Sequence, residues 1–136
     1  MPRKPLPSEV SGTVVSFDFG LARIGAAVGN TLSRSARPLR ILPGRTNEEK
    51  WRGVSAVLSE WEPAAIVVGV PLRSDGSRQE MTDRAERFAR QLEGRYGLPV
   101  YPVDERFSSV EVERGREKID DESAAVILEQ WLEENS

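Results

Sequence analysis

The pattern of apolar and polar residues divides the first part of the chain mainly into strands. Residues 13–19 are rich in β-branched and aromatic side chains, and a second short apolar run follows at residues 24–28. Two such runs so close together predict an antiparallel hairpin. A third strand is predicted over residues 36–42, where Pro38 favours a short strand or a sheet edge. Residues 64–70 are continuously apolar, which is typical of a strand buried on both faces.

Other segments follow the period of a helix. Helices are predicted over residues 47–61, 77–95 and 121–133, and a short helix is predicted to open at Ser108. A serine followed three residues later by glutamate, the spacing of a capping box, opens both the second of these and the short one. A last strand is predicted over residues 99–103. The order of these elements predicts an α/β domain with one mixed sheet.

Length and composition place the chain among globular proteins. It has 136 residues, 38% hydrophobic and 30% charged, as expected for one domain. We assign residues 13–136 to that domain and expect residues 1–12, which are rich in proline, to be a disordered lead-in. No apolar run approaches the roughly 20 residues that span a bilayer, and no apolar signal-peptide region follows the first basic residues. We therefore expect a cytoplasmic protein without a membrane segment.

The absence of cysteine and histidine narrows the possible chemistry. Disulfides, thiolate zinc sites, cysteine nucleophiles and histidine acid–base catalysis are excluded. Carboxylates, hydroxyls, Lys, Arg, Tyr or a metal ion held by oxygen remain. The net charge of −3 is unevenly distributed, with a balance of +5 over residues 1–52 and −8 over residues 53–136. The basic half could face phosphate groups, although ordinary surface charge explains the asymmetry equally well.

Three carboxylates lie near the ends of predicted strands or helices. Asp18 interrupts an apolar strand, yet a solvent-facing aspartate would look the same. Glu105 follows the last predicted strand, at the end where ligands gather in α/β sheets, but Asp104 competes with it and both could belong to a solvated turn. Asp121 opens the last helix and points along its apolar stripe, although aspartate is also a favoured N-cap.

Together the three acids predict a site for divalent metal ions. Mg²⁺ and Mn²⁺ prefer hard oxygen ligands, and two such ions about 4 Å apart can activate water and stabilise a leaving oxygen. Two loops are candidates for phosphate contacts. Residues 20–23 form a glycine turn that includes Arg23, and residues 71–76 lie before a helix N-terminus, a ready anion site. Each is also compatible with an ordinary surface turn.

Four segments of the chain match, in order, the motifs of one family. They are residues 17–28 (FDFGLARIGAAV), residues 67–72 (VVGVPL) with Asp75, Gly76, Phe88 and Leu92, residues 104–109 (DERFSS) and residues 121–128 (DESAAVIL). The sequence thus resembles the YqgF family, also called RuvX or Holliday-junction-resolvase-like, which includes pre-16S rRNA nucleases. The match covers the chain from about Val14 to Leu132. Ser16 stands where a glycine is usual, and residues 108–109 are serines where threonines are common, but neither departure removes a carboxylate.

The resemblance implies an RNase H-like fold, in which a mixed five-stranded sheet of three antiparallel strands followed by parallel strands is flanked by helices. It implies a hydrolase, a nuclease that trims the 5′ end of the 16S ribosomal RNA precursor in ribosome biogenesis or cuts branched DNA. Mg²⁺ or Mn²⁺, as two ions, would be the cofactor. The implied metal ligands are Asp18, Glu105 and Asp121, and the implied phosphate contacts are Arg23, Arg73 and Arg106.

Other interpretations remain. The chain could be a Holliday-junction resolvase, and a homodimer would suit symmetric cutting, although a monomer is equally compatible with the sequence. It could also be a nucleic-acid-binding factor without catalysis that assists ribosome assembly or transcription, but such a binder gains nothing from acids that face phosphate. An actin-like phosphotransferase also begins its phosphate loops with Asp-x-Gly on an RNase H-like core. However, 136 residues are too few for the two lobes that enclose ATP.

Overall fold

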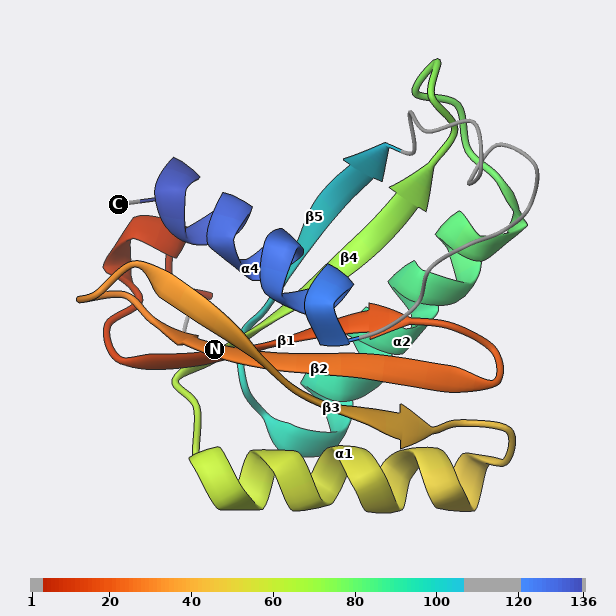
Figure 1. Cartoon of the computed structure of the whole chain (residues 1–136), viewed down its shortest axis with the longest axis horizontal. Coiled ribbons are helices and arrows are strands. Elements are labelled where there is room, and N and C mark those ends of the chain that lie inside the picture. Colours follow the sequence, from red (N-terminus) through yellow and green to blue (C-terminus); the bar gives the residue numbers. More distant parts are fainter. Residues whose placement is uncertain (1–3, 107–120, 136) are drawn as a thin grey trace.

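A five-stranded sheet lies between two layers of helices in the computed structural model, which describes residues 4–106 and 121–135 (Figure 1). The strands are β1 (Thr13–Phe19), β2 (Arg23–Asn30), β3 (Ser35–Pro43), β4 (Ala65–Leu72) and β5 (Val100–Arg106), in the spatial order β3-β2-β1-β4-β5. β1, β2 and β3 pair antiparallel, whereas β4 runs parallel to β1, and β5 runs parallel to β4. This arrangement confirms the predicted fold class.

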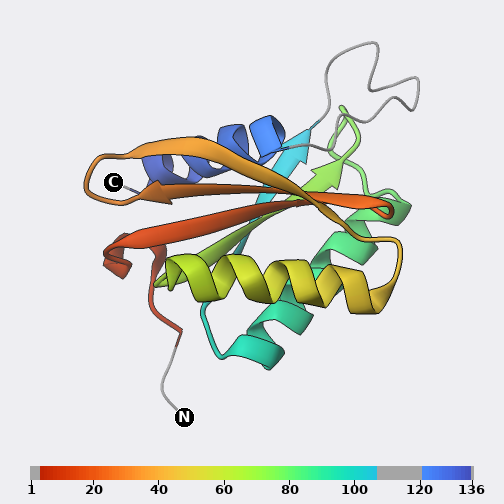
Figure 2. The same cartoon turned by 60° about the horizontal axis from the view of Figure 1, so that its bottom comes forward.

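The helices divide between the two faces of the sheet. α1 (Asn47–Trp61) and α2 (Glu80–Tyr96) cover one face, and α4 (Asp121–Glu134) covers the other (Figure 2). On the α1–α2 face the core includes Phe17 and Phe88, whose rings meet edge to face with centroids 5.9 Å apart. On the α4 face Ile127 and Leu128 pack against apolar residues of β1, β4 and β5. Burial of each such side chain contributes about 1.5–3 kcal/mol, so both layers are anchored by their apolar stripes.

The strands are longer than their apolar runs predicted, and this changes the setting of two candidate residues. β3 is an edge strand, so Pro38 removes no hydrogen bond from the sheet interior, as the sequence predicted. β4 continues to Leu72 and β5 to Arg106. Their final residues pair with each other in register, which extends both strands beyond the hydrophobic segments. Glu105 therefore lies within a strand and not in a turn.

The start of α2 differs from the prediction. The helix begins at Glu80, because the Ser77 N–H donates to Asp75 Oδ1 (2.9 Å) in the preceding loop. The Gln79 N–H donates to Thr82 Oγ1 (3.0 Å), so the half of the capping box that forms joins Gln79 to Thr82. The sequence spacing that suggested a cap at Ser77 instead belongs to a turn.

Residues 4–12, the described part of the lead-in, lie beside the sheet. They contain a 3-10 turn, η1 (Pro7–Glu9), and lie against the start of β5. The Lys4 ammonium donates to the Val100 carbonyl, and the Tyr101 hydroxyl donates to the Pro5 carbonyl. Because β5 is the outer strand of the sheet, the lead-in supplies partners at an exposed edge. The short helix predicted at Ser108 lies outside the described residues, within which no helix is both long and apolar enough to cross a membrane.

Candidate functional site

Asp18 lies on β1 on the face of the sheet that α4 covers. Alternate residues of a strand share a face, and the Ser16 hydroxyl on that face donates to the Ala124 carbonyl of α4 (2.7 Å). Asp18 is only 3% exposed. The alternative of an ordinary solvent-facing aspartate therefore does not describe this residue. A buried carboxylate at the end of a strand is costly unless charges or hydrogen bonds offset its burial, which marks it for a specific role.

Gly69 on β4 lies between the strands that carry Asp18 and Glu105. Asp18 on β1 pairs with Gly69 on β4, and Gly69 pairs with Val103 on β5. Glu105 lies two residues after Val103. A Cβ added to Gly69 would lie 3.0 Å from Glu105 Oε2. The Glu105 side chain thus leans back over β4 toward Asp18. Asp18 and Glu105 thus lie on the strands on either side of β4, at the level of Gly69.

The structure resolves the competition between Asp104 and Glu105. Tyr101 and Val103 belong to the apolar cluster under α4, so Glu105, which alternates with them, faces α4 as well. Asp104 is exposed and lies on the opposite face with Val100. Only Glu105 shares a face with Asp18.

Asp121 begins α4 at the same end of the sheet. The later turns of α4 lie near the start of β1, since Leu128 and Leu132 pack near Gly29, the β2 partner of Val14. The first turn lies further along β1, where the Ala124 carbonyl accepts from Ser16. The N-terminus of α4 is therefore directed toward Asp18. Asp121 is half-buried, as its place in the apolar stripe predicted. Within residues 4–106 and 121–135, however, no three acidic side chains lie close enough together to hold one metal ion.

The residues at this end of the sheet fit a hard divalent cation better than a soft one. The side-chain donors of Asp18, Glu105 and Asp121 are all carboxylate oxygens, the ligands that Mg²⁺ and Mn²⁺ prefer. The end of the Ile127 side chain and Glu105 Oε2 both lie over Gly69. Asp18 and Glu105 share the α4 face of the sheet at this level, and Asp121 begins the helix that covers it.

The predicted phosphate contacts differ in their surroundings. Arg23 is exposed at the first position of β2, beside the turn that follows β1. Arg73 is also exposed, but its Nη1 donates to the Arg78 carbonyl (2.7 Å), so part of its guanidinium ties the β4–α2 loop together. Arg106 ends β5, and its side chain is outside the described residues. All three lie at the carboxyl edge of the parallel strands, the edge that also holds Asp18 and Glu105.

The loop between β4 and α2 is held by its own hydrogen bonds. Ser77 donates to Asp75 and lowers the pKa of that carboxyl, and Asp83 and Glu86 hold Arg78 and raise the pKa of its guanidinium. Arg78 is therefore engaged with carboxylates. The buried Thr82 hydroxyl donates to the Pro71 carbonyl and joins the end of β4 to the first turn of α2.

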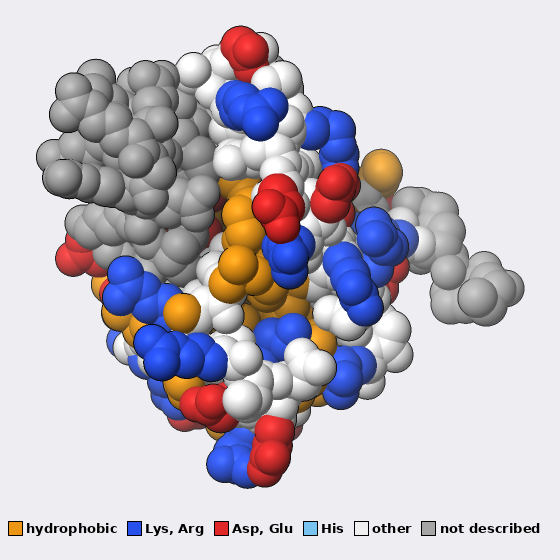
Figure 3. Space-filling model, turned by 90° about the vertical axis from the view of Figure 1, so that its right-hand side faces the viewer, with side chains coloured by type: hydrophobic (Ala, Val, Ile, Leu, Met, Phe, Trp, Pro, Cys, Tyr) orange, Lys and Arg blue, Asp and Glu red, His pale blue; other side chains and the backbone are white. Residues whose placement is uncertain are grey.

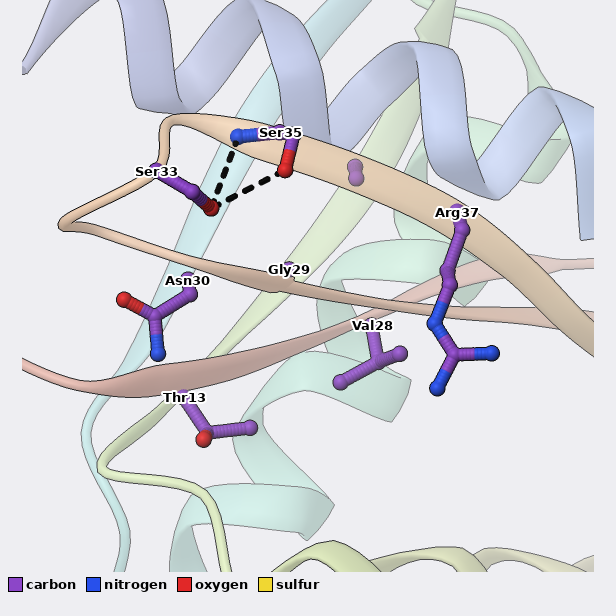
Figure 4. Close-up of a pocket in the computed structure, with 8 residues that line it drawn as sticks. Thr13, Val28, Gly29, Asn30, Ser33, Ser35 and Arg37 are labelled. Atoms are coloured by element: carbon purple, nitrogen blue, oxygen red, sulfur yellow. Dashed lines mark hydrogen bonds between the residues drawn. The ribbon is translucent and has the colours of Figure 1, made fainter.

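A separate polar hollow lies at the opposite end of β1 and β2. Its volume is about 240 Å³, and hydroxyl groups of Thr13, Ser33 and Ser35, together with Asn30 and Arg37, line it (Figure 4). The Ser33 and Ser35 hydroxyls lie 2.9 Å apart and bond to each other. None of the candidate carboxylates lines this hollow, so the chemistry predicted from the sequence belongs to the other end of the sheet.

Comparison with known proteins identifies the family. A family model named RuvX and described as Holliday junction resolvase matches residues 12–134. The chain belongs to the RuvX family. A relative from Burkholderia ambifaria (strain MC40-6), named "Putative pre-16S rRNA nuclease", is 49% identical over 135 residues, covering 91% of each chain. A relative of the same name from Hydrogenovibrio crunogenus is 43% identical over 128 residues, covering 91% of this chain and 96% of its own.

Solved structures share the fold of this RuvX family member at low sequence identity. RuvC of T. thermophilus, solved in complex with a Holliday junction substrate, superposes with a TM-score of 0.53 at 19% identity. The superposition covers 89% of this chain and 93% of that one. The fowlpox virus Holliday junction resolvase superposes with a TM-score of 0.55 at 13% identity, covering 90% and 99%. These likenesses support the RNase H-like arrangement of the sheet and helices.

Sequence reasoning missed three residues that shape the site of this RuvX family member: Ser16, Gly69 and Thr82. Ser16 drew notice only as a departure from a usual glycine, and its partner on α4 is 108 positions away. Gly69 offered a usable signal, since a glycine within a β-branched strand often marks a close approach. Thr82 offered none, because its bond to Pro71 depends on how the loop folds.

Proposed function

We propose that this RuvX family member is a metal-dependent nuclease that hydrolyses phosphodiester bonds, with the 5′ end of the 16S ribosomal RNA precursor as its substrate. Family membership and the name shared by relatives with nearly half their residues in common support this assignment. The observation that carries it is that the buried Asp18 and the half-buried Glu105 share the α4 face of the sheet, with Glu105 Oε2 over Gly69, the β4 partner of Asp18. Without histidine or cysteine, carboxylates that hold a divalent ion are the groups through which this chain would hydrolyse a phosphodiester bond.

Asp18, Glu105 and Asp121 would hold Mg²⁺ or Mn²⁺, with Asp18 in the central position. When bound, a pair of such ions supplies an activated water and offsets the charge that develops on the phosphate. Other residues of the protein position these three carboxylates. Ser16 holds the first turn of α4 against β1, Gly69 admits the Glu105 carboxylate, and Ile127 closes the space above Gly69 from the α4 side.

Arg23, Arg73 and Arg106 would orient the substrate from the carboxyl edge of the sheet. Guanidinium groups bind phosphate oxygens in a bidentate manner, and Arg23 is exposed beside the β1–β2 turn. In this arrangement Arg73 has a double function, because one of its nitrogens also holds the loop that it belongs to. A phosphate placed by these residues would lie next to the carboxylates on β1 and β5.

Cleavage by matched variants tests the proposal. Asp18→Asn keeps the size of the side chain and removes its charge, and we expect it to abolish cleavage of a pre-16S rRNA fragment in Mn²⁺ while the circular dichroism spectrum stays that of wild type. Asp104→Asn makes the same change one residue from Glu105 but on the opposite, exposed face, and it should cleave normally. Undiminished cleavage by Asp18→Asn would refute the assignment of the site.

Branched DNA is the alternative substrate, because the matching family model is described as a Holliday junction resolvase. A four-way DNA junction assayed beside the RNA fragment, each with Mn²⁺ or EDTA, distinguishes the two. Cleavage of the junction alone, dependent on Asp18, would assign the chain as a resolvase and would call for a dimer that makes paired cuts. Binding of both substrates without cleavage of either would instead favour a non-catalytic assembly factor.

A further inference from the structure

Three cations gather on the face of the molecule opposite α4. Lys50 in the first turn of α1 and Arg87 and Arg95 on α2 form what we call the α1–α2 basic cluster. Arg87 and Arg95 are eight residues apart, so they lie on one side of α2, and both are exposed. Figure 3 views the molecule from the side on the right of Figure 1 and shows several Lys and Arg side chains, together with some Asp and Glu side chains, around a strip of hydrophobic side chains.

Aromatic rings lie beneath two of these cations, Lys50 and Arg95. The Arg95 guanidinium lies 4.0 Å from the centre of the Trp51 ring, and the Lys50 ammonium lies 5.1 Å from it. Trp51 is itself stacked on Phe88, with ring centroids 5.6 Å apart. The Ser55 and Tyr96 hydroxyls are 2.6 Å apart and join α1 to α2 beside the cluster. Lys50 and Arg95 therefore stand on packed aromatic rings, where less side-chain entropy is lost when a ligand binds.

The three cations of the cluster form no ion pair with an acidic residue among the described residues. Other cations of the described residues, among them Lys4, Arg40, Arg52, Arg78 and Arg84, form ion pairs. No ion pair found within residues 4–106 and 121–135 includes Lys50, Arg87 or Arg95. Burial and repulsion from Arg95 and Arg87 lower the pKa of the Lys50 ammonium. An anion bound between them would relieve this repulsion.

The position of the cluster indicates which anion. Lys50 lies 5.8 Å from the ring of Phe19, and Phe19 is the residue after Asp18 on β1. The cluster thus reaches the same end of β1 as the candidate active site, but on the other face of the sheet. A long polyanion that passes over the carboxyl edge of the sheet could contact both places, whereas a small anion at one place could not. An extended ligand with regularly spaced phosphates fits this geometry.

We propose that the α1–α2 basic cluster binds the sugar–phosphate backbone of the RNA substrate in a segment that flanks the cleaved bond. This inference rests on the proposed nuclease function, and it adds a second contact region away from the carboxylates. The cluster makes contacts with phosphates and not with bases, so it contributes affinity and orientation without sequence preference. Its contribution should therefore depend strongly on salt.

Binding measured without cleavage separates this inference from the function it rests on. Fluorescence anisotropy in EDTA would compare the wild-type protein with the triple variant Lys50→Gln, Arg87→Gln, Arg95→Gln. The matched control is Lys4→Gln, Arg40→Gln, Arg52→Gln, which removes the same number of charges from cations held by carboxylates. Each protein would be titrated with a pre-16S rRNA fragment and with a truncated fragment that keeps only the cleavage site, across a series of salt concentrations.

We expect the cluster variant to bind the long fragment at least about tenfold more weakly than wild type. We also expect a plot of the logarithm of its binding constant against the logarithm of the salt concentration to have a slope smaller in magnitude by about 2. Each lost phosphate contact removes roughly 0.7–0.9 from this slope. The control variant and the truncated fragment should show little change. Equal affinity and equal slope for the cluster variant and wild type would overturn the inference while leaving the nuclease assignment intact. Failure of the wild-type protein to bind any RNA would overturn both.

Discussion

Gly69 lies under the side chains of Ile127 and Glu105, and its substitution tests at the scale of one residue whether this packing positions Glu105. In Gly69→Ala the new Cβ would lie 2.5 Å from Ile127 Cδ1 and 3.0 Å from Glu105 Oε2, so the ends of both flexible side chains must shift. We expect the free energy of unfolding to fall by about 1 kcal/mol, and because a displacement of about 1 Å can slow a reaction roughly 100-fold, the smaller displacement of Glu105 should slow cleavage by about tenfold. Thermal unfolding and single-turnover cleavage should both show the loss.

Gly94→Ala is the control for that substitution. Gly94 lies on α2, and a Cβ added there would have no atom within 4 Å. Replacement of glycine by alanine within a helix stabilises it by about 0.5–1 kcal/mol, so this variant should unfold at a slightly higher temperature and cleave at the wild-type rate. A Gly69→Ala protein with wild-type cleavage would show that the packing over Gly69 does not position Glu105.

Single residues also show how far sequence reasoning reaches. Asp18 could be chosen from the sequence because an acid inside an apolar strand is unusual. Strand alternation sent Asp104 and Glu105 to opposite faces but did not say which face held the site, so only the family resemblance selected Glu105. The structure decides because β5 continues to Arg106. The metal-binding roles of Asp18, Glu105 and Asp121 stay predictions.

At the scale of elements, one hydrogen bond connects the central strand to the helix that holds Asp121. The Ser16 hydroxyl is buried and donates to the Ala124 carbonyl (2.7 Å) in the first turn of α4. Ser16→Ala removes this bond, and we expect a loss of about 1 kcal/mol in the free energy of unfolding. Because the bond positions the start of α4, the variant should also need a higher Mn²⁺ concentration for half-maximal cleavage, with little change in maximal rate.

Ser55→Ala provides the comparison for Ser16→Ala. It removes another hydroxyl contact between elements, to Tyr96, on the face of the sheet away from Asp18. Its Mn²⁺ requirement should match that of wild type, even if its stability falls. If Ser16→Ala also left the Mn²⁺ requirement unchanged, α4 would be positioned by apolar packing alone and Ser16 would have only a structural role.

The elements themselves were largely predictable, whereas their ends were not. Apolar periodicity predicted all the strands and the three long helices that the described residues contain. It placed the start of α2 at residue 77 because a serine–glutamate spacing resembles a cap, but hydrogen bonds among Asp75, Ser77, Gln79 and Thr82 place it at Glu80. Composition also could not show that Lys4 and Pro5 contact the outer strand, because these bonds depend on where β5 lies in the folded sheet.

At the scale of the whole molecule, the charge count by halves of the chain did not locate the α1–α2 basic cluster. Lys50 comes from the basic half, but Arg87 and Arg95 come from the half whose net charge is −8. Packing of α1 beside α2 brings the three together, and acids of the same half are directed elsewhere, for example toward Arg78 and Arg84. Net charge of a segment therefore says little about a surface that two helices build jointly.

The candidate metal ligands also come together only when the whole chain folds, and this gives a prediction about stability. Asp18, Glu105 and Asp121 lie on β1, β5 and α4, so the unfolded chain has no preformed site and a metal ion should bind the folded state selectively. At a Mn²⁺ concentration about ten times the dissociation constant, binding contributes about 1.4 kcal/mol. In a domain of this size that raises the melting temperature by about 5 °C, measurable by differential scanning fluorimetry against EDTA.

Asp18→Asn should remove that thermal shift, because the loss of the central carboxylate weakens the site more than it weakens the fold. Asp104→Asn, an equal change of charge on the exposed face of β5, should keep the shift in full. This comparison does not depend on any nucleic acid, so it separates metal binding from substrate choice. An identical Mn²⁺ shift in wild type and Asp18→Asn would mean that the ion binds elsewhere on an acidic surface, and the carboxylates over Gly69 would then need another explanation.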